Sequence, residues 1–161
     1  MREFMSNHAV ANAMLMLDYN EIEVELIPFA EGSSQPIPRI SDAEVRVALQ
    51  PLGAREVFQP GEGAIRNSFD QFLDGLERFG PLVRSGLILP RDLAPYLSYY
   101  LDIIGNPQNP RMLPPIRETL WRYVEYYGYR GAQMLFQEFG YNIRPPEASV
   151  KRNGPAVEGG R

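Results

Sequence analysis

A seam of apolar residues in the middle of the chain commits it to a helical architecture. Its members follow one another at alternating spacings of four and three residues: Ile65, Phe69, Phe72, Leu76, Phe79 and Val83. This a/d repeat predicts one long helix that packs a continuous apolar stripe against other helices. Pro81 lies inside the repeat and lacks a backbone N–H, so we expect a kink or break near residues 79–82. Ser85-Gly86 is the expected end of the helix.

Shorter helices are predicted on both sides of the seam. An apolar stretch at residues 7–18 begins where Ser6 or Asn7 can act as the N-cap. The tetrapeptide Ser41-Asp-Ala-Glu44 has the form of a capping box and opens a short helix that Pro51 ends. Further helices are expected at residues 92–104, 115–127 and 130–139, each followed by a glycine.

A strand is predicted at residues 21–27. Ile22, Val24 and Leu26 alternate there with three glutamates, which is the pattern of a half-buried strand with a charged outer face. A single strand is not stable alone, so a partner is required. Residues 36–40 are the first candidate for that partner, and residues 55–58 are the second.

The expected fold is therefore mainly α, a compact helical bundle of about five to six helices with one small N-terminal β-hairpin. We expect a flexible start at residues 1–6 and a single helical domain at residues 7–143. Residues 144–161 are rich in Pro, Gly and charged residues with almost no apolar content, which predicts a disordered tail.

Composition removes several classes of function. The 161-residue chain has no cysteine and one histidine, so thiol chemistry and Cys-based or His-rich metal sites are excluded. The single lysine, Lys151, falls in the predicted tail, which excludes a P-loop or Schiff-base lysine in the folded part. The net charge is −4, and residues 1–62 carry four arginines against ten acidic residues, which disfavours nucleic acid and anionic lipid.

No cofactor is expected from this composition. Met1-Arg-Glu-Phe-Met5 does not have the pattern of a secretory signal, and no apolar stretch is long enough to span a bilayer, so a cytoplasmic location is expected.

Residues 117–130 interleave arginine with aromatic side chains. A protein-binding face there would consist of Arg117, Trp121, Arg122, Tyr126 and Arg130, because Trp, Tyr and Arg dominate binding hot spots. The alternative is that Tyr123 and Tyr127 belong to the core. Trp121 and Tyr126 would then flank the apolar stripe with their polar edges in water. A stacking platform for nucleic-acid bases is the third possibility, which Glu118 and Glu125 disfavour.

Three carboxylates on the long helix are the candidate catalytic or metal-binding group. Asp70, Asp74 and Glu77 lie at i, i+4 and i+7 and could serve acid–base chemistry or bind a divalent cation. Arg66 and Arg78 stand four residues from Asp70 and Asp74 respectively, so the alternative is an exposed flank of ion pairs. Mixed charges along a helix are the ordinary composition of an exposed face, which favours the second interpretation.

Two further groups of polar residues are expected to be structural. His8 has no carboxylate or second histidine at ligand spacing, so a surface or cap role is expected. Glu21, Glu23 and Glu25 lack the loop spacing and glycine of an EF-hand and are expected to form a solvated strand face.

Three segments carry a resemblance to a known family. They are Asn12-Ala-Met-Leu-Met-Leu-Asp-Tyr19, residues 65–79 and residues 92–104. Over roughly residues 12–141 the chain resembles an uncharacterised family of small bacterial helical proteins, known only as a domain of unknown function. The resemblance implies no catalytic residues. Members of this family often carry the domain after an N-terminal membrane helix, which implies a membrane-proximal setting.

The sequence is thus most consistent with a non-enzymatic interaction or regulatory domain in the bacterial cytoplasm. Its partner is expected to be an unidentified protein, membrane-associated in the setting that the resemblance implies. No catalytic residue and no metal ligand is assigned. The alternative is a divalent-cation-dependent enzyme that uses the carboxylates of Asp70, Asp74 and Glu77.

Overall fold

Seven helices and one two-stranded sheet make up the described part of the chain. The structure is a computed structural model that describes residues 1–26, 37–51 and 58–145. The helices are α1 (Arg2–Met5), α2 (His8–Asp18), α3 (Asp42–Ala48), α4 (Pro60–Arg84), α5 (Pro90–Gly105), α6 (Pro114–Tyr126) and α7 (Arg130–Glu138). The strands are β1 (Glu21–Glu23) and β2 (Arg39–Ser41). The prediction of a mainly helical bundle with one N-terminal hairpin is confirmed.

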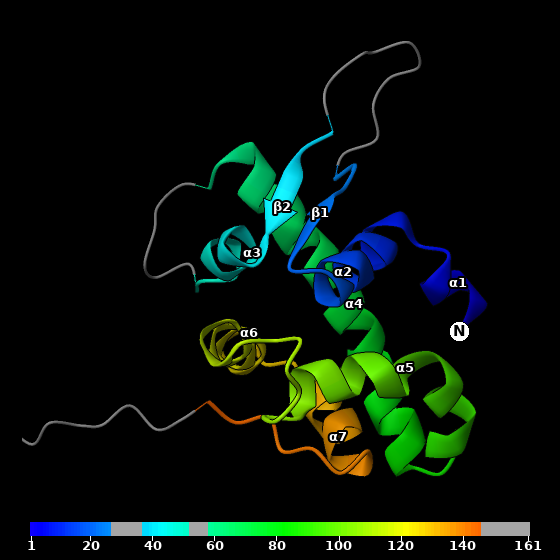
Figure 1. The fold of residues 1–161 in the computed structure, drawn as a ribbon. Coiled ribbons are helices and arrows are strands. Elements are labelled where there is room, and N and C mark those ends of the chain that lie inside the picture. Colours follow the sequence, from blue (N-terminus) through cyan, green and yellow to red (C-terminus); the bar gives the residue numbers. More distant parts are fainter. Residues whose placement is uncertain (27–36, 52–57, 146–161) are drawn as a thin grey trace, which may run out of the picture.

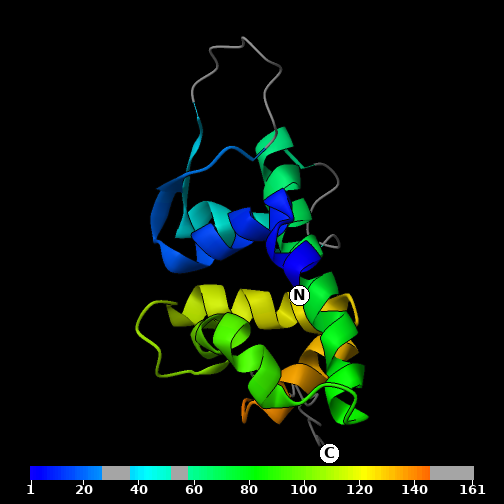
Figure 2. The same cartoon turned by 90° about the vertical axis from the view of Figure 1, so that its right-hand side faces the viewer.

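Helix α4 runs through the molecule, and the other elements gather around its two halves (Figure 1). The hairpin, α2 and α3 lie around its N-terminal half, and α5, α6 and α7 lie on the side of its C-terminal half (Figure 2). Five of the six seam residues are at most 5% exposed, the exception being Phe79, which is partly buried: Ile65, Phe69, Phe72, Leu76 and Val83. The seam therefore belongs to the hydrophobic core along the length of α4.

Of the kink or break expected at Pro81, the break does not occur: α4 continues through Pro81 to Arg84. Pro81 lies in the last turn, where its missing N–H leaves one helical acceptor, the Glu77 carbonyl, without its usual donor. The turn is completed beyond it by the Ser85 N–H, which donates to the Pro81 carbonyl at 2.9 Å.

The contact between α4 and α7 is the most extensive between any two elements. Two glycines face each other in it: a Cβ on Gly80 would overlap the Gly131 carbonyl, and a Cβ on Gly131 would overlap the Glu77 carbonyl. The Glu77 carboxylate also accepts from the Ala132 N–H at 3.0 Å and so satisfies one of the free donors in the first turn of α7. The absence of two side chains thus lets the helix backbones touch.

The hairpin pairs β1 with β2 in antiparallel register, with Glu21 opposite Ser41 and Glu23 opposite Arg39. This agrees with the first predicted partner; most of the second, residues 55–58, lies outside the described residues. Ser41 then caps α3, with its Oγ accepting from the Glu44 N–H and the Glu44 carboxylate accepting from the Ser41 N–H, which confirms the capping box.

Residues 1–6, expected as a flexible start, contain α1 and a packed aromatic ring. The Phe4 ring centroid lies 6.0 Å from that of Phe72 and 5.6 Å from that of Phe79, over the bare backbone of Gly75. A four-residue helix is too short to carry a sequence signal, and tertiary packing is what holds it.

At the other end of the described chain, Ile143 is 2% exposed and belongs to the core. Beyond Arg144 and Pro145 the predicted tail lies outside the described residues. In the described segments, no helix combines the length and the apolar character needed to cross a bilayer.

Candidate functional site

Two of the five residues predicted as a binding face point into the protein. The Arg117 side chain is 3% exposed and donates to the carbonyls of Ile103, Pro107 and Asn109, at 3.4, 3.1 and 2.8 Å. The Trp121 indole N–H donates to the Ile104 carbonyl at 2.9 Å. Both side chains therefore fasten α6 to the end of α5 and to the loop that follows it.

The other three residues of that face are exposed. Arg122 and Tyr126 lie one turn apart on α6, with the Arg122 guanidinium 3.8 Å from the Glu118 carboxylate, and Arg130 begins α7. Since Arg117 and Trp121 are turned inward, the five residues do not form one surface.

Arg66 was expected on an exposed flank beside Asp70 and is instead buried, at 8% exposure. Its guanidinium donates to the carbonyls of Ala48 and Gln50, both at 2.9 Å, and to the Tyr127 hydroxyl at 2.6 Å. It also lies 4.9 Å from the centroid of the Tyr123 ring. Arg66 thus joins α3, α4 and α6 in the interior. Its charge can be buried there because the guanidinium is hydrogen-bonded.

Asp70 is likewise a structural anchor. Its carboxylate accepts hydrogen bonds from the hydroxyls of Tyr123 and Tyr129, the second at 3.0 Å. Burial, reinforced by the Asp70 charge, raises the pKa of both tyrosines above the ordinary value. The carboxylate is therefore occupied by two phenols of the α6–α7 region and does not belong to an exposed flank.

The charges of all three carboxylates contribute to the raised pKa of Tyr129, but the other two side chains have different surroundings from Asp70. Glu77 caps α7 through the Ala132 N–H, and Asp74 lines a hollow between α4 and the N-terminal helices together with Glu3 and Arg78. No group of three or more His, Cys, Asp or Glu side chains in the described segments is arranged to hold a metal ion.

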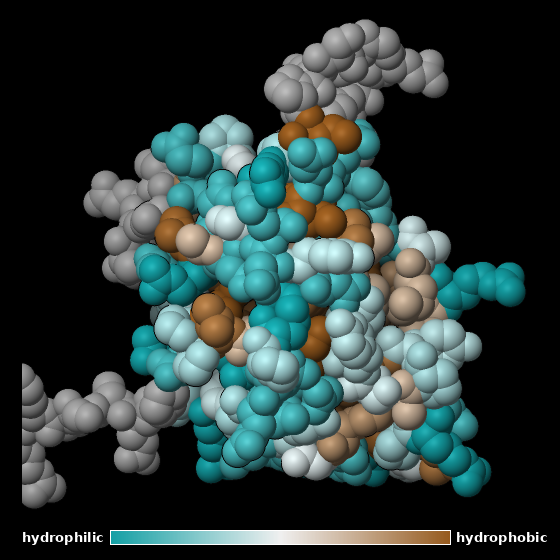
Figure 3. Space-filling model, in the orientation of Figure 1, coloured by the Kyte–Doolittle hydropathy of each residue, from teal (hydrophilic) through white to brown (hydrophobic). Residues whose placement is uncertain are grey.

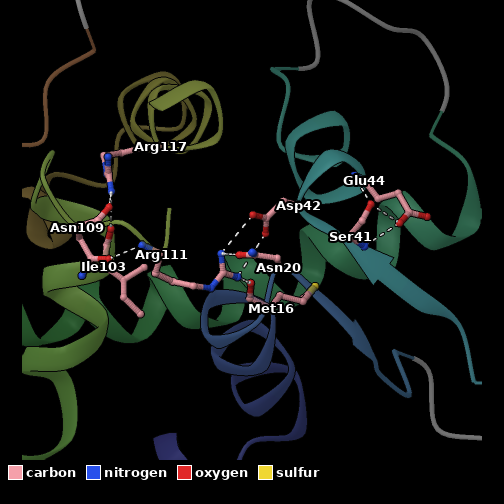
Figure 4. A network of polar contacts seen from close by, with 9 residues as sticks. All are labelled: Met16, Asn20, Ser41, Asp42, Glu44, Ile103, Asn109, Arg111 and Arg117. Carbon is pink, nitrogen blue, oxygen red and sulfur yellow. Dashed lines mark hydrogen bonds and ion pairs between the residues drawn. The ribbon is translucent and has the colours of Figure 1, made fainter. Parts of the chain in front are cut away.

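A third arginine, Arg111, which the sequence analysis did not single out, joins three parts of the chain (Figure 4). The Arg111 guanidinium donates to the Met16 carbonyl at 2.9 Å and to Asn20 Oδ1 at 2.7 Å. It also pairs with both oxygens of the Asp42 carboxylate, at 3.2 and 3.3 Å. The loop after α5 is thus bonded to the end of α2 and to the start of α3.

The N-terminal polar residues have structural roles as well. His8 Nε2 and Asn12 Nδ2 lie 2.8 and 2.9 Å from the carbonyl oxygen of Glu25, so α2 holds the segment that follows β1. Glu21 and Glu23 are exposed, and Glu21 pairs with Arg39 across the sheet at 2.7 Å. The expected roles of His8, Glu21 and Glu23 agree with these contacts. The predicted strand at residues 21–27 is shorter than expected, because β1 ends at Glu23, and Glu25 is partly buried beyond it.

Nine large apolar or aromatic side chains among the described residues are exposed. Four of them, 37–55% exposed, come from α2, from the residue that follows it and from α5, two helices that contact each other. They are Leu15, Tyr19, Tyr96 and Tyr99, and we call them the tyrosine face. Tyr96 lies among the apolar residues of α5 and is half exposed. On the side seen in Figure 3, strongly apolar surface is confined to small separate spots between polar side chains.

A carboxylate and a fourth tyrosine lie within the tyrosine face. The Tyr100 hydroxyl donates to Asp18 Oδ2 at 3.3 Å, and the rings of Tyr99 and Tyr100 meet edge to face at 5.1 Å. Burial and the Asp18 charge raise the pKa of Tyr100 to about 12. The same two causes raise the pKa of Tyr99, against the opposing charge of Arg111. The negative charge of Asp18 thus acts on the hydroxyl groups of both tyrosines.

Comparison with known proteins adds no template for this surface, since the chain matches no protein-family model, no curated protein and no solved structure.

Proposed function

We propose that the protein is a non-enzymatic interaction domain and that the tyrosine face is where its protein partner docks. The observation that carries the proposal is the exposure of three tyrosine rings, Tyr19, Tyr96 and Tyr99, at 50–55% on adjoining helices. Tyrosine combines a large apolar ring with a polar tip and loses little conformational entropy on binding, so clustered exposed tyrosines are typical of binding surfaces.

The use of the other distinctive side chains supports this choice of surface. Trp121, Arg117 and Arg66 make their hydrogen bonds inside the protein, and Asp70 and Glu77 are committed to the contacts of α4 with α6 and α7. A cation-dependent enzyme built on the carboxylates would have to break those contacts. The bacterial cytoplasmic setting and the membrane-associated partner suggested by the family resemblance belong to the same proposal.

The test is site-specific photocrosslinking in cells. A photoreactive phenylalanine replaces Leu15, at the edge of the tyrosine face, and in a matched control it replaces Leu87, which is 76% exposed in the turn after α4. We expect a discrete adduct, identified by mass spectrometry, from position 15 and none from position 87.

Tyr19→Ala and Tyr99→Ala should each remove the adduct at position 15, whereas Tyr126→Ala on α6 should leave it intact. Equal adducts from positions 15 and 87, or an adduct at position 15 that survives both alanine substitutions, would refute the proposed docking surface. Because the three tyrosines are similarly exposed, at 52%, 55% and 58%, a general loss of surface tyrosine does not explain the expected difference.

A further inference from the structure

A hollow lies where α3 meets α6, two helices that contact each other on different halves of the molecule (Figure 1). Its volume is about 410 Å³, within the range of small-molecule binding sites. Four of the six side chains that line it are apolar, namely Ala43, Leu113, Pro115 and Ile116. Ile116 is 5% exposed and Leu113 is 62% exposed, so apolar surface reaches there from the core to solvent.

The two charged side chains that line this hollow, Asp42 and Arg46, are used differently. The Asp42 carboxylate pairs through both oxygens with the Arg111 guanidinium, at 3.2 and 3.3 Å, so its charge is compensated. Arg46 is exposed, and within the described segments it makes no hydrogen bond or ion pair. A guanidinium beside apolar surface is therefore available to an anion.

The start of α6 adds positive potential on the other side of the hollow. Leu113 is the N-cap residue and gives no side-chain hydrogen bond, and the first turn of α6 contains no acidic residue. The N-terminal end of a helix carries partial positive charge, which acidic side chains ordinarily balance. The lining thus suits a ligand with an apolar body and a negative end.

We propose that this hollow binds a medium-chain aliphatic carboxylate, whose chain lies against Leu113 and Ile116 and whose carboxylate pairs with Arg46. The site shares no residue with the tyrosine face and goes beyond the function proposed for that face. A carboxylate is favoured over a phosphate because a planar guanidinium donates two parallel hydrogen bonds to it, and one arginine balances its single charge. A chain is required because each buried methylene group strengthens binding by about fourfold.

The proposal is tested with three probes that separate charge from chain length. Octanoate is the ligand, octanamide is its neutral isostere, and butanoate has the same charge on a shorter chain. Each is titrated into ¹⁵N-labelled full-length protein, and backbone amide shifts are followed by NMR. We expect octanoate to shift the amides of residues 42–47, 113 and 116, and to bind about tenfold more tightly than either octanamide or butanoate.

Two arginine variants with the same change in net charge separate the site from general electrostatics. Arg46→Gln should weaken octanoate binding about tenfold and leave octanamide binding unchanged. Arg122→Gln, at an exposed position of α6 outside the hollow, should change octanoate binding less than about twofold. Arg46 makes no contact that the fold needs, so both variants should unfold at nearly the wild-type temperature, which a thermal melt verifies.

A variant of the apolar wall tests the position of the chain. Leu113→Ser removes the exposed apolar side chain and should weaken octanoate and octanamide alike, by about fivefold. Serine is a favourable N-cap, so this variant should keep or raise the unfolding temperature. Leu87→Ser, at a more exposed leucine outside the hollow, is the matched control and should leave binding unchanged.

Equal affinity for octanoate and octanamide would mean that the chain binds without Arg46, and equal affinity for octanoate and butanoate would mean that any carboxylate binds there. Either result overturns the proposal. Equal effects of the two arginine variants, equal effects of the two leucine variants, or shifts that lie outside residues 42–47 and 113–116 would overturn it as well. The photocrosslink at position 15 is a separate measurement, so failure of this site and failure of the tyrosine face are distinguishable.

Discussion

Replacement of Gly131 by alanine tests the close crossing of α4 and α7. The new Cβ would overlap the Glu77 carbonyl, which belongs to the backbone of α4 and cannot rotate away as a side chain could. The two helices must therefore separate along their most extensive contact. We expect a lower free energy of unfolding, in contrast to the gain that alanine ordinarily brings to a helix.

The magnitude follows from three contributions. Overpacking of a tight contact costs about 1–3 kcal/mol, and separation of the helices weakens the cap that the Glu77 carboxylate gives the Ala132 N–H, worth about 1 kcal/mol. The helix propensity of alanine offsets about 1 kcal/mol. The expected net loss is about 2 kcal/mol, which lowers Tm by about 4–8 °C for a chain of this size.

Guanidinium titration measures the loss, followed by far-UV circular dichroism and by fluorescence of Trp121, the single tryptophan. Gly63→Ala is the matched control, because a Cβ at this helical glycine of α4 meets nothing within 4 Å and should stabilise by about 0.5–1 kcal/mol. Gly80→Ala should act like Gly131→Ala, with a double variant well below additive, since both disturb one contact. Equal stability of Gly131→Ala and Gly63→Ala would refute the reasoning.

Two further predictions concern the interior tyrosines and their acceptor. Asp70→Ala leaves the hydroxyls of Tyr123 and Tyr129 without an acceptor and should lower the free energy of unfolding by about 2 kcal/mol. Asp74→Ala should change it by less than about 0.5 kcal/mol, and equal losses in denaturant titrations would contradict the assignment. Because burial raises the pKa of Tyr123, Tyr129 and Tyr100 in the folded state, the last to about 12, stability should be constant up to about pH 10 and fall as the pH rises further. Tyr129→Phe should make that fall shallower, and stability that stays flat to about pH 12 in the wild type would be incompatible with these raised pKa values.

The helices from α2 onward and the hairpin were predictable because their signals are local. The seam from Ile65 to Val83, the capping box at Ser41 and the alternation around Val24 each depend on residues within a few positions of one another. Pro81 marked a break that does not occur, because a proline in the last turn removes one hydrogen bond only.

The interior roles of the arginines could not be predicted from such patterns. Arg66 is bonded to Ala48, 18 residues before it, and to Tyr127, 61 residues after it, and the acceptors are mostly carbonyls, which every residue carries. Arginine is also rarely buried, so the sequence favours an exposed position. Arg111 is the one arginine in the Asn- and Pro-rich loop after α5. That isolation was the only local feature that could have indicated a structural role for it.

The tyrosine face was missed for a different reason. Tyr96 and Tyr99 lie among the apolar residues of α5, and the helical pattern of that segment does not separate exposed rings from core rings. Which side of α5 faces solvent depends on where α2 and α7 pack, and no local pattern contains that information. Asp18, a charged residue at the end of an otherwise apolar helix, was the sequence feature that indicated exposed surface at the end of α2.

The bonds of Arg111 have a consequence for the order in which a nascent chain can fold. The hydrogen bonds that fix the end of α2 join residues 91 and 95 positions apart, and the one from Tyr100 to Asp18 spans 82. During synthesis from the N-terminus, α2 and the hairpin leave the ribosome long before these donors exist. The first third of the protein therefore acquires its final arrangement only after the loop beyond α5 has emerged, and contacts of such long range make this late step slow relative to formation of the individual helices.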